Sequence, residues 1–229
     1  MIIFFDLDGT LIDSTQAIIN SLELALKDYG YSFVDSKEAK RLIGISTEDM
    51  FSTLGVKDED IKNIVSAYRT HYAKFYVSHT HILNGAKEAV LLAHKNNATI
   101  GLVTTKSYDF SKKILENYGL DKYFSVIVGG DEVSKCKPNA EPILKALTRL
   151  KLNDLRCENY LSKEELQKEF DFNKIYMIGD TTNDTKAAKN AGVNALVTLF
   201  EYAPSDVMKD EGVLVFNTPL ECVEHIFSK

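Results

Sequence analysis

The sequence has few cysteines, no long apolar segment and no cluster of basic residues. The three cysteines, Cys136, Cys157 and Cys222, are odd in number and far apart, so they indicate neither a disulfide framework nor a zinc site. No apolar run approaches the roughly 18 residues that a membrane span needs, and the N-terminus lacks a basic region ahead of an apolar one. We therefore expect a cytoplasmic protein without a membrane partner.

The charge balance limits the partners in the same way. The net charge of −6, without a Lys/Arg cluster, argues against a nucleic-acid-binding surface. An anionic substrate would have to be bound by local charges or by a metal ion. A chain of 229 residues with 45% hydrophobic residues can form one large domain or a core with a smaller appendage, and the sequence leaves open whether it is a monomer or a homodimer.

The first residues combine an apolar run with two carboxylates. Residues 1–5 are apolar and are followed directly by Asp6, Asp8 and Gly9. A short unbroken apolar run is typical of a strand buried on both faces of a parallel sheet, and ligands of open α/β sheets bind at the carboxyl ends of such strands. Turn formation alone would also explain the acids and the glycine, so the rest of the sequence has to decide between the two interpretations.

Residues 14–83 have helical patterns and, by our interpretation, no strand. The patterns predict helices over 14–30, 36–42, 47–54 and 58–76. This insert is expected to form a small helical domain, with residues 1–13 and 84–229 forming the core domain.

Two features of the insert could indicate a ligand site. Its last helix carries an apolar and aromatic stripe, for which the packed core of a helical bundle is the better interpretation. The stripe consists of Ile61, Ile64, Val65, Tyr68, Tyr72 and Phe75. His79 and His81 have no third ligand nearby, so we assign both to a hinge or loop rather than to a metal site.

Strands and helices alternate through the remainder of the chain. Strands are predicted at 98–103, 124–128, 174–178, 193–199 and 213–216, with helices at 108–118, 141–150, 185–191 and 219–227 between or after them. This alternation predicts an α/β fold with a doubly wound, Rossmann-like parallel sheet. In the polar stretch 151–173, Ser162 and Glu165 form a capping-box pattern, which predicts a short exposed helix in a surface segment.

Three of the predicted strands end in polar residues that the fold would bring to one edge of the sheet. These residues are Asp6 and Asp8, Thr104 and Thr105, and Asp180 and Asp184. Carboxylates that meet in one crevice repel one another unless they are protonated or share a cation, and Mg²⁺ prefers such oxygen ligands. Thr104 and Lys137 would then bind further oxygens of a substrate phosphate, as a hydroxyl donor and as a positive charge.

Four segments resemble the motifs of the haloacid dehalogenase-like hydrolase superfamily. They are DLDGTLIDS at 6–14, VTTK at 103–106, Lys137-Pro138, and GDTTND at 179–184. The helical insert after the first motif resembles a cap of subclass I, and the whole run is similar to phosphoglycolate-phosphatase-like members. Two departures from the usual pattern are the residues after Pro138, which read Asn-Ala-Glu, and the length of the stretch 151–173.

The resemblance implies a role for each matching residue. Asp6 matches the nucleophile, which forms an aspartyl-phosphate and also binds the metal. Asp8 matches the general acid/base, whose backbone carbonyl is a further metal ligand. Thr104, Thr105 and Lys137 match phosphate-binding residues. Asp180 matches a direct metal ligand, and Asp184 matches a residue that acts through a metal-bound water. Gly44, Ile45 and Ser46 resemble the cap loop that faces the site.

The function implied is a Mg²⁺-dependent phosphomonoester hydrolase acting on a small phosphorylated metabolite. An aspartate at position 8 disfavours dehalogenases and phosphonatases, which resemble one another in lacking it. A phosphomutase of the β-phosphoglucomutase type stays open as an alternative, as does an inorganic pyrophosphatase. A non-catalytic binding protein on the same scaffold is the remaining possibility, although all the reactive positions are filled.

Overall fold

The apolar N-terminal segment forms the central strand of the fold. In the computed structural model, which describes residues 1–32, 35–200 and 212–228, β1 (Ile2–Phe5) pairs in parallel with β4 (Thr99–Val103) and with β6 (Ile175–Gly179). The sheet is completed by β5 (Val126–Val128), β7 (Asn194–Thr198) and β8 (Leu214–Phe216), and its order is β5-β4-β1-β6-β7-β8. The pairs within this sheet are parallel, as predicted.

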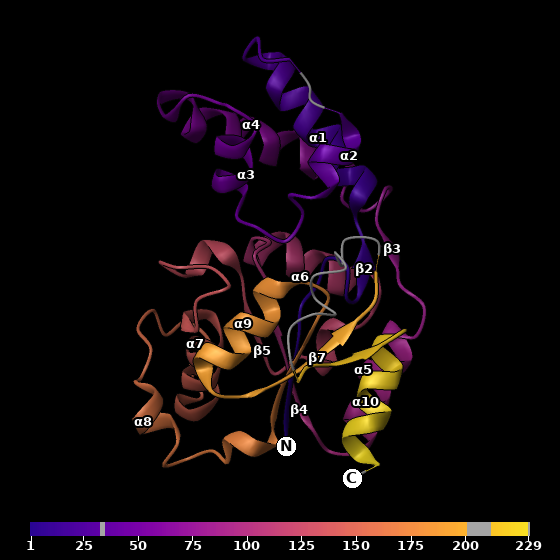
Figure 1. The fold of residues 1–229 in the computed structure, drawn as a ribbon, viewed down its shortest axis with the longest axis vertical. Helices are drawn as coiled ribbons and strands as arrows, with labels where there is room; N and C mark the ends of the chain where they lie inside the picture. The colour runs from indigo at the N-terminus through magenta and orange to yellow at the C-terminus, as the bar shows by residue number, and fades with distance from the viewer. Residues whose placement is uncertain (33–34, 201–211, 229) are drawn as a thin grey trace.

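Helices cover both faces of this sheet (Figure 1). Because successive side chains of a strand point to opposite faces, Ile3 and Phe5 of β1 enter one core cluster while Ile2 and Phe4 enter the other. The first cluster is covered by α5 (Ala86–Lys95), α6 (Tyr108–Asn117) and α10 (Pro219–Phe227), and the second by α7 (Glu141–Leu152), α8 (Lys163–Leu166) and α9 (Thr182–Ala191). Three 3₁₀ turns lie at Asp121–Tyr123, Gly130–Glu132 and Phe172–Lys174. The predicted doubly wound α/β fold is confirmed.

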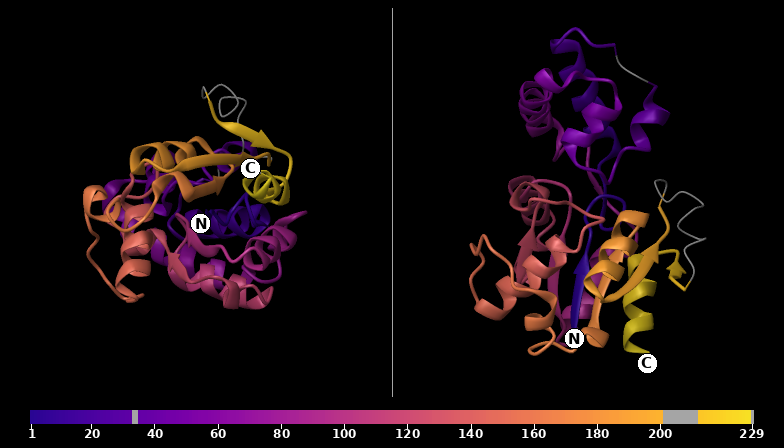
Figure 2. Two further views of the ribbon diagram at one scale, coloured as in Figure 1. Left: turned by 90° about the horizontal axis from the view of Figure 1, so that it is seen from below. Right: turned by 60° about the vertical axis from the view of Figure 1, so that its left-hand side comes forward.

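Four helices form a separate group beside the sheet, as Figure 2 shows. They are α1 (Thr15–Asp28), α2 (Ser36–Lys40), α3 (Thr47–Thr53) and α4 (Asp58–Phe75). They enclose a hydrophobic cluster of their own, in which Ile64, Val65, Tyr68 and Tyr72 of α4 are buried. The aromatic stripe is therefore part of the core of this group, as the helical spacing predicted.

A two-stranded ribbon connects the helical group to the sheet. Ile12–Asp13 (β2) pairs antiparallel with His81–Ile82 (β3). The prediction that residues 14–83 contain no strand is wrong at β3, because a two-residue strand is too short to show a periodicity. His79 lies in a turn, as expected, whereas His81 belongs to the ribbon. No helix in the described parts of the chain is long and apolar enough to cross a membrane.

The helix after β6 begins earlier than its apolar pattern predicted. We expected it to start at residue 185, but α9 starts at Thr182. The cause is a side-chain cap: the backbone N–H and the hydroxyl of Thr181 both donate to Asp184 Oδ2, at 3.0 and 2.7 Å. Asp184 therefore lies in the first turn of a helix rather than in a loop.

The polar stretch 151–173 contains the predicted capping box. Ser162 Oγ accepts the Glu165 N–H at 3.3 Å, and Glu165 Oε2 accepts the Ser162 N–H at 2.9 Å, at the start of α8. The stretch is more than a surface decoration, because Leu166 and Phe172 are buried in the second core cluster. It covers part of the sheet face beside α7.

Candidate active site

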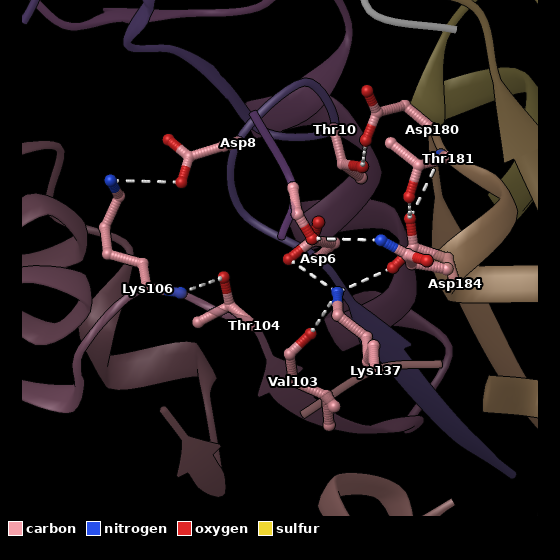
Figure 3. A network of polar contacts seen from close by, with 12 residues as sticks. Asp6, Asp8, Thr10, Val103, Thr104, Lys106, Lys137, Asp180, Thr181 and Asp184 are labelled. Atoms are coloured by element: carbon pink, nitrogen blue, oxygen red, sulfur yellow. Dashed lines mark hydrogen bonds and ion pairs between the residues drawn. The ribbon is translucent and has the colours of Figure 1, made fainter. Parts of the chain in front are cut away.

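Two neighbouring strands bring carboxylates from the two ends of the chain together. Asp6 follows β1 and Asp180 follows β6, and the Asp6 N–H continues the pairing of these strands by donating to the Ile178 carbonyl at 2.9 Å. One carboxylate oxygen from each of Asp6, Asp180 and Asp184 lies within 4.8 Å of the other two, and all three residues are buried. Figure 3 shows this cluster, which we call the carboxylate cluster.

The glycine that ends β6 makes room for one member of the cluster. A Cβ atom at Gly179 would lie 2.2 Å from Asp184 Cγ and 2.4 Å from its Cβ. Such distances are far below van der Waals contact, so a larger residue at position 179 would displace the carboxylate. The Asp184 side chain therefore requires a glycine at position 179, and both residues belong to the same sequence motif.

Lys137 is the cation of the carboxylate cluster. Its Nζ lies 2.9 Å from Asp6 Oδ1 and 2.6 Å from Asp184 Oδ1, and donates to the Val103 carbonyl at 3.1 Å (Figure 3). Burial alone would lower the pKa of this ammonium, but the carboxylates of Asp184 and Asp6 raise its pKa above the usual value. Its Nζ donates to Asp184 Oδ1 and to the Val103 carbonyl and forms an ion pair with Asp6, so a phosphate oxygen would compete with these partners.

The cluster carries more negative than positive charge. Burial raises the pKa of Asp6 to about 6, and the carboxylates of Asp184 and Asp8 add to this effect while Lys137 opposes it. Burial likewise raises the pKa of Asp180 well above its usual value, with Asp184 and Asp6 contributing. Asp180 Oδ2 is buried and has no hydrogen-bond partner among the residues that the structure describes. The surplus of negative charge and an oxygen acceptor without a hydrogen-bond partner fit a hard divalent cation such as Mg²⁺.

Asp8 belongs to a second group, which reaches into the helical group. Asp8 Oδ2 lies 3.0 Å from Lys106 Nζ, and Asp8 Oδ1 accepts a hydrogen bond from the Ser14 hydroxyl. Lys106 Nζ also donates to the Tyr72 hydroxyl at 2.9 Å and lies 4.4 Å from the centroid of the same ring. Burial would lower the pKa of Lys106, but Asp8, followed by Tyr72 and Tyr68, raises it. Lys106 is therefore a buried cation shared by Asp8 and α4.

Lys106 belongs to the VTTK motif, but the sequence did not indicate a role for it. Its place at the end of β4, directly after two residues that we did select, was a usable signal. Thr104 is buried in the same loop, and its hydroxyl oxygen accepts the Lys106 N–H at 3.3 Å. The partner on α4 had no counterpart in the sequence pattern.

A cavity of about 90 Å³ lies between the sheet and the helical group, beside Asp8. Thr105 and Lys106 line it from the sheet side, and Tyr72 lines it from α4. The segment Gly44-Ile45-Ser46, which we expected to face the site, lines the same cavity. Its Gly44 carbonyl accepts a hydrogen bond from Asn183 Nδ2 at 3.3 Å, so the helical group contacts the first turn of α9, which also carries Asp184.

These features define a class of protein: a doubly wound, Rossmann-like α/β domain with an acidic crevice at the strand ends and helices inserted after the first strand. Comparison with known families agrees, since the haloacid dehalogenase-like hydrolase family matches residues 3–198. The chain belongs to this family and is an enzyme of its hydrolase class.

Individual relatives cover most of the chain. It is 31% identical over 207 residues to a protein named pyrophosphatase PpaX from Halalkalibacterium halodurans, covering 90% of this chain and 87% of the relative. It is 31% identical over 201 residues to a phosphoglycolate phosphatase from Aquifex aeolicus, covering 88% and 85%. Among solved structures, a haloacid dehalogenase-like hydrolase from Bacteroides fragilis has a TM-score of 0.80 at 24% identity, covering 96% and 98%, and shows the fold alone.

Proposed function

We propose that this chain is a Mg²⁺-dependent phosphatase that hydrolyses a small phosphomonoester through an aspartyl-phosphate at Asp6. The observation that carries this proposal is the carboxylate cluster with its single buried lysine. A buried carboxylate next to a cation site can act as a nucleophile toward a phosphoryl group, whereas a purely structural role would leave several buried charges uncompensated. Relatives named phosphatases support the same reaction class.

The metal would be held by the Asp6 and Asp180 carboxylates and by the Asp8 backbone carbonyl, with Asp184 acting through a bound water. When bound, a divalent cation supplies charge neutralisation between the attacking carboxylate and the phosphoryl oxygens. Thr104, Thr105 and Lys137 would hold the phosphoryl oxygens in line with Asp6.

The protein's own residues carry the bond changes in two steps. In the first, an Asp6 carboxylate oxygen bonds to phosphorus while the ester oxygen leaves and takes a proton from Asp8. In the second, Asp8 takes a proton from water, whose oxygen bonds to phosphorus and releases phosphate from Asp6. The atoms balance as one ester and one water converted to one alcohol and one phosphate.

Residues 14–83 would act in this reaction as a cap over a core formed by 1–13 and 84–229. The cavity lined from both sides, the Lys106–Tyr72 hydrogen bond and the Asn183–Gly44 hydrogen bond support this division. A cap that closes over the phosphoryl group excludes bulk water during the first step.

A second candidate substrate is inorganic pyrophosphate, because the relative from Halalkalibacterium halodurans is named a pyrophosphatase. The same two steps apply, with phosphate as the leaving group. A phosphomutase would differ from both candidates in requiring a bisphosphate for turnover.

The test is phosphate release from a panel of sugar phosphates, nucleotides, phosphoglycolate and pyrophosphate. We expect EDTA to abolish release and Mg²⁺ to restore it, while Ca²⁺ restores it poorly because it favours more ligands and a looser geometry. Full activity after thorough chelation would overturn the metal assignment. A rate that depends on added sugar bisphosphate would replace the hydrolase by a mutase.

A further inference from the structure

The cavity beside Asp8 is where the leaving group of the substrate has to lie. Asp8 protonates the leaving oxygen in the proposed reaction, so the atoms attached to that oxygen enter the space next to its carboxylate. Among the described residues, the cations that line this cavity are Lys106 and Arg69. They differ in burial: the side chain of Lys106 is 7% exposed and that of Arg69 is 48% exposed.

Lys106 has a hydrogen-bond donor to spare. Its ammonium carries three N–H groups, of which one donates to the Tyr72 hydroxyl, while Asp8 Oδ2 forms an ion pair with the ammonium at 3.0 Å. The described residues offer no further acceptor to Nζ within hydrogen-bond distance, and the residue lines the cavity. Figure 3 shows the ammonium on the Asp8 side of the site, away from the carboxylate cluster. A ligand in the cavity can therefore take the third donor.

The position of this donor favours a ligand with a negative charge. Hydrogen bonds between a buried ammonium and an anion are shorter and stronger than neutral ones. The other charged groups that line the cavity compensate one another or face solvent: Arg69 Nη2 lies 3.9 Å from Glu48 Oε1, with both side chains about half exposed, and Asp131 is exposed. Solvent screens these charges more than that of Lys106.

The cavity has room for a small anionic group next to Lys106. Its volume is about 90 Å³, which is enough for several water molecules. A carboxylate on a short carbon chain, or a second phosphate, fits such a space.

We propose that Lys106, held by Tyr72, determines specificity by recognising a second negative charge on the leaving group. The substrates of this class are small phosphate esters or anhydrides whose leaving group is itself an anion, either a carboxylate or a phosphate. This inference rests on the proposed phosphatase function, because it assumes that Asp8 faces the leaving oxygen.

The test compares two substrates that differ only in this charge: phosphoglycolate and its neutral amide, phosphoglycolamide. A hydrogen bond to a charged group contributes about 1.5–3 kcal/mol, so kcat/KM of the unmodified enzyme should be about 10- to 100-fold higher for phosphoglycolate. In Lys106→Met the ratio should fall to about 1, because the remaining contacts are common to both substrates. A loss of general catalytic efficiency cancels in this ratio.

Arg69→Met is the matched control, since it removes the other cation of the cavity. It should retain the ratio of the unmodified enzyme. If Arg69→Met abolishes the discrimination and Lys106→Met keeps it, the proposal is wrong and the anion binds at Arg69. Pyrophosphate is measured in parallel to distinguish the two kinds of leaving group. A higher kcat/KM for phosphoglycolate indicates a site for a carboxylate, and a higher kcat/KM for pyrophosphate indicates a site for a phosphate. Lys106→Met should slow either one.

Lys106→Met leaves Asp8 with fewer partners, so its folding is checked by circular dichroism. Tyr72→Phe then provides a second variant that keeps the charge and removes one hydroxyl; it should lower the ratio by about 3- to 10-fold, in the range of one lost hydrogen bond. An unchanged ratio in Tyr72→Phe, or a ratio near 1 in the unmodified enzyme, overturns the inference while leaving the phosphatase function in place. Absence of phosphate release from every substrate, including p-nitrophenyl phosphate, would overturn both.

Discussion

The carboxylate cluster and the Asp8–Lys106–Tyr72 group lie side by side but are assembled differently. In the first, three carboxylates share one ammonium, which contacts Asp6 and Asp184, and every member comes from the part of the chain that forms the sheet and its covering helices. In the second, one carboxylate faces one ammonium, and the third member comes from α4 of the helical group. The first group is therefore complete once the sheet has formed, while the second is complete only when the helical group is in contact with the sheet. We infer that the carboxylate cluster carries out the phosphoryl transfer and that the Asp8–Lys106–Tyr72 group interacts with the leaving group.

Asp6→Asn should have the largest effect, because it removes the proposed nucleophile from the carboxylate cluster. An amide does not attack phosphorus, so both turnover and any covalent phosphoenzyme should be lost. The measurement is intact-protein mass spectrometry after rapid quenching with p-nitrophenyl phosphate. A phosphate adduct on Asp6→Asn would mean that the nucleophile lies elsewhere.

Asp8→Asn should have a smaller effect, of about 10²- to 10⁴-fold on kcat, which is usual for a general acid/base. The nucleophile is intact, and p-nitrophenolate leaves without needing a proton. The first step should therefore proceed in part, while hydrolysis of the phosphoenzyme stays slow. We expect a phosphate adduct on this variant in the same mass-spectrometric experiment. The reverse pattern in the two variants would show that the roles of the two aspartates are exchanged.

The difference between the two groups also decides how much the sequence could predict. Asp6 and Asp180 follow apolar runs that read as buried strands, so their convergence follows from the geometry of a parallel sheet. Lys106 contacts Tyr72 only because α4 lies near the end of β4, and no periodicity in the sequence predicts this placement of α4. A helical stripe predicted that Tyr72 is buried, as it is, but could not reveal that its hydroxyl points at a lysine.

The secondary-structure predictions were likewise correct where the sequence is periodic and wrong where it is not. Long periodic segments were predicted correctly, whereas β3 was missed because two residues have no period. The start of α9 was misplaced because the Thr181–Asp184 cap, rather than an apolar pattern, fixes it. The family resemblance supplied roles for Asp8 and Asp184 that the residues alone would not have distinguished.

Asp180→Asn should separate the stability of the cluster from its metal affinity. Raised pKa values of Asp6 and Asp180 mean that, as pH rises from about 4 to 6, the unfolded chain binds fewer protons than the metal-free folded protein, so stability falls over this window. For Asp6, a pKa of about 6 instead of 3.8 corresponds to about 3 kcal/mol. Removing one repelling carboxylate should therefore raise the Tm of the metal-free protein at pH 7, by about 2–4 °C for each kcal/mol of repulsion removed.

The same variant should no longer gain stability from Mg²⁺, since it lacks one of the proposed metal-binding carboxylates. Differential scanning calorimetry with EDTA and with Mg²⁺ measures both effects. Glu224→Gln, an exposed position on α10, removes one negative charge at a distance from the site and should change neither. A metal-free Asp180→Asn protein that is less stable than the unmodified one would contradict the raised pKa.

The stabilisation of the unmodified protein by Mg²⁺ should depend on pH. Metal and protons compete for the same carboxylates, so the Tm increase should be largest at pH 7–8 and shrink as pH falls through the Asp6 pKa of about 6. The Tm difference with and without Mg²⁺, measured from pH 5 to pH 8, tests this. A difference that is constant over the range would place the metal away from Asp6.

Asn183→Ala should have the smallest effect, because it removes the hydrogen bond that the first turn of α9 donates to the Gly44 carbonyl. One such bond contributes about 0.5–1.5 kcal/mol, so kcat/KM should fall by about 2- to 10-fold. Asn194→Ala is the control: its Nδ2 donates to the Asn173 and Ile175 carbonyls at the opposite end of the sheet. That variant should lose stability and keep its kinetic constants. If Asn183→Ala also retains its kinetic constants, the Asn183–Gly44 hydrogen bond does not couple the helical group to the carboxylate cluster. The Lys106–Tyr72 hydrogen bond is then the contact that couples the helical group to the site.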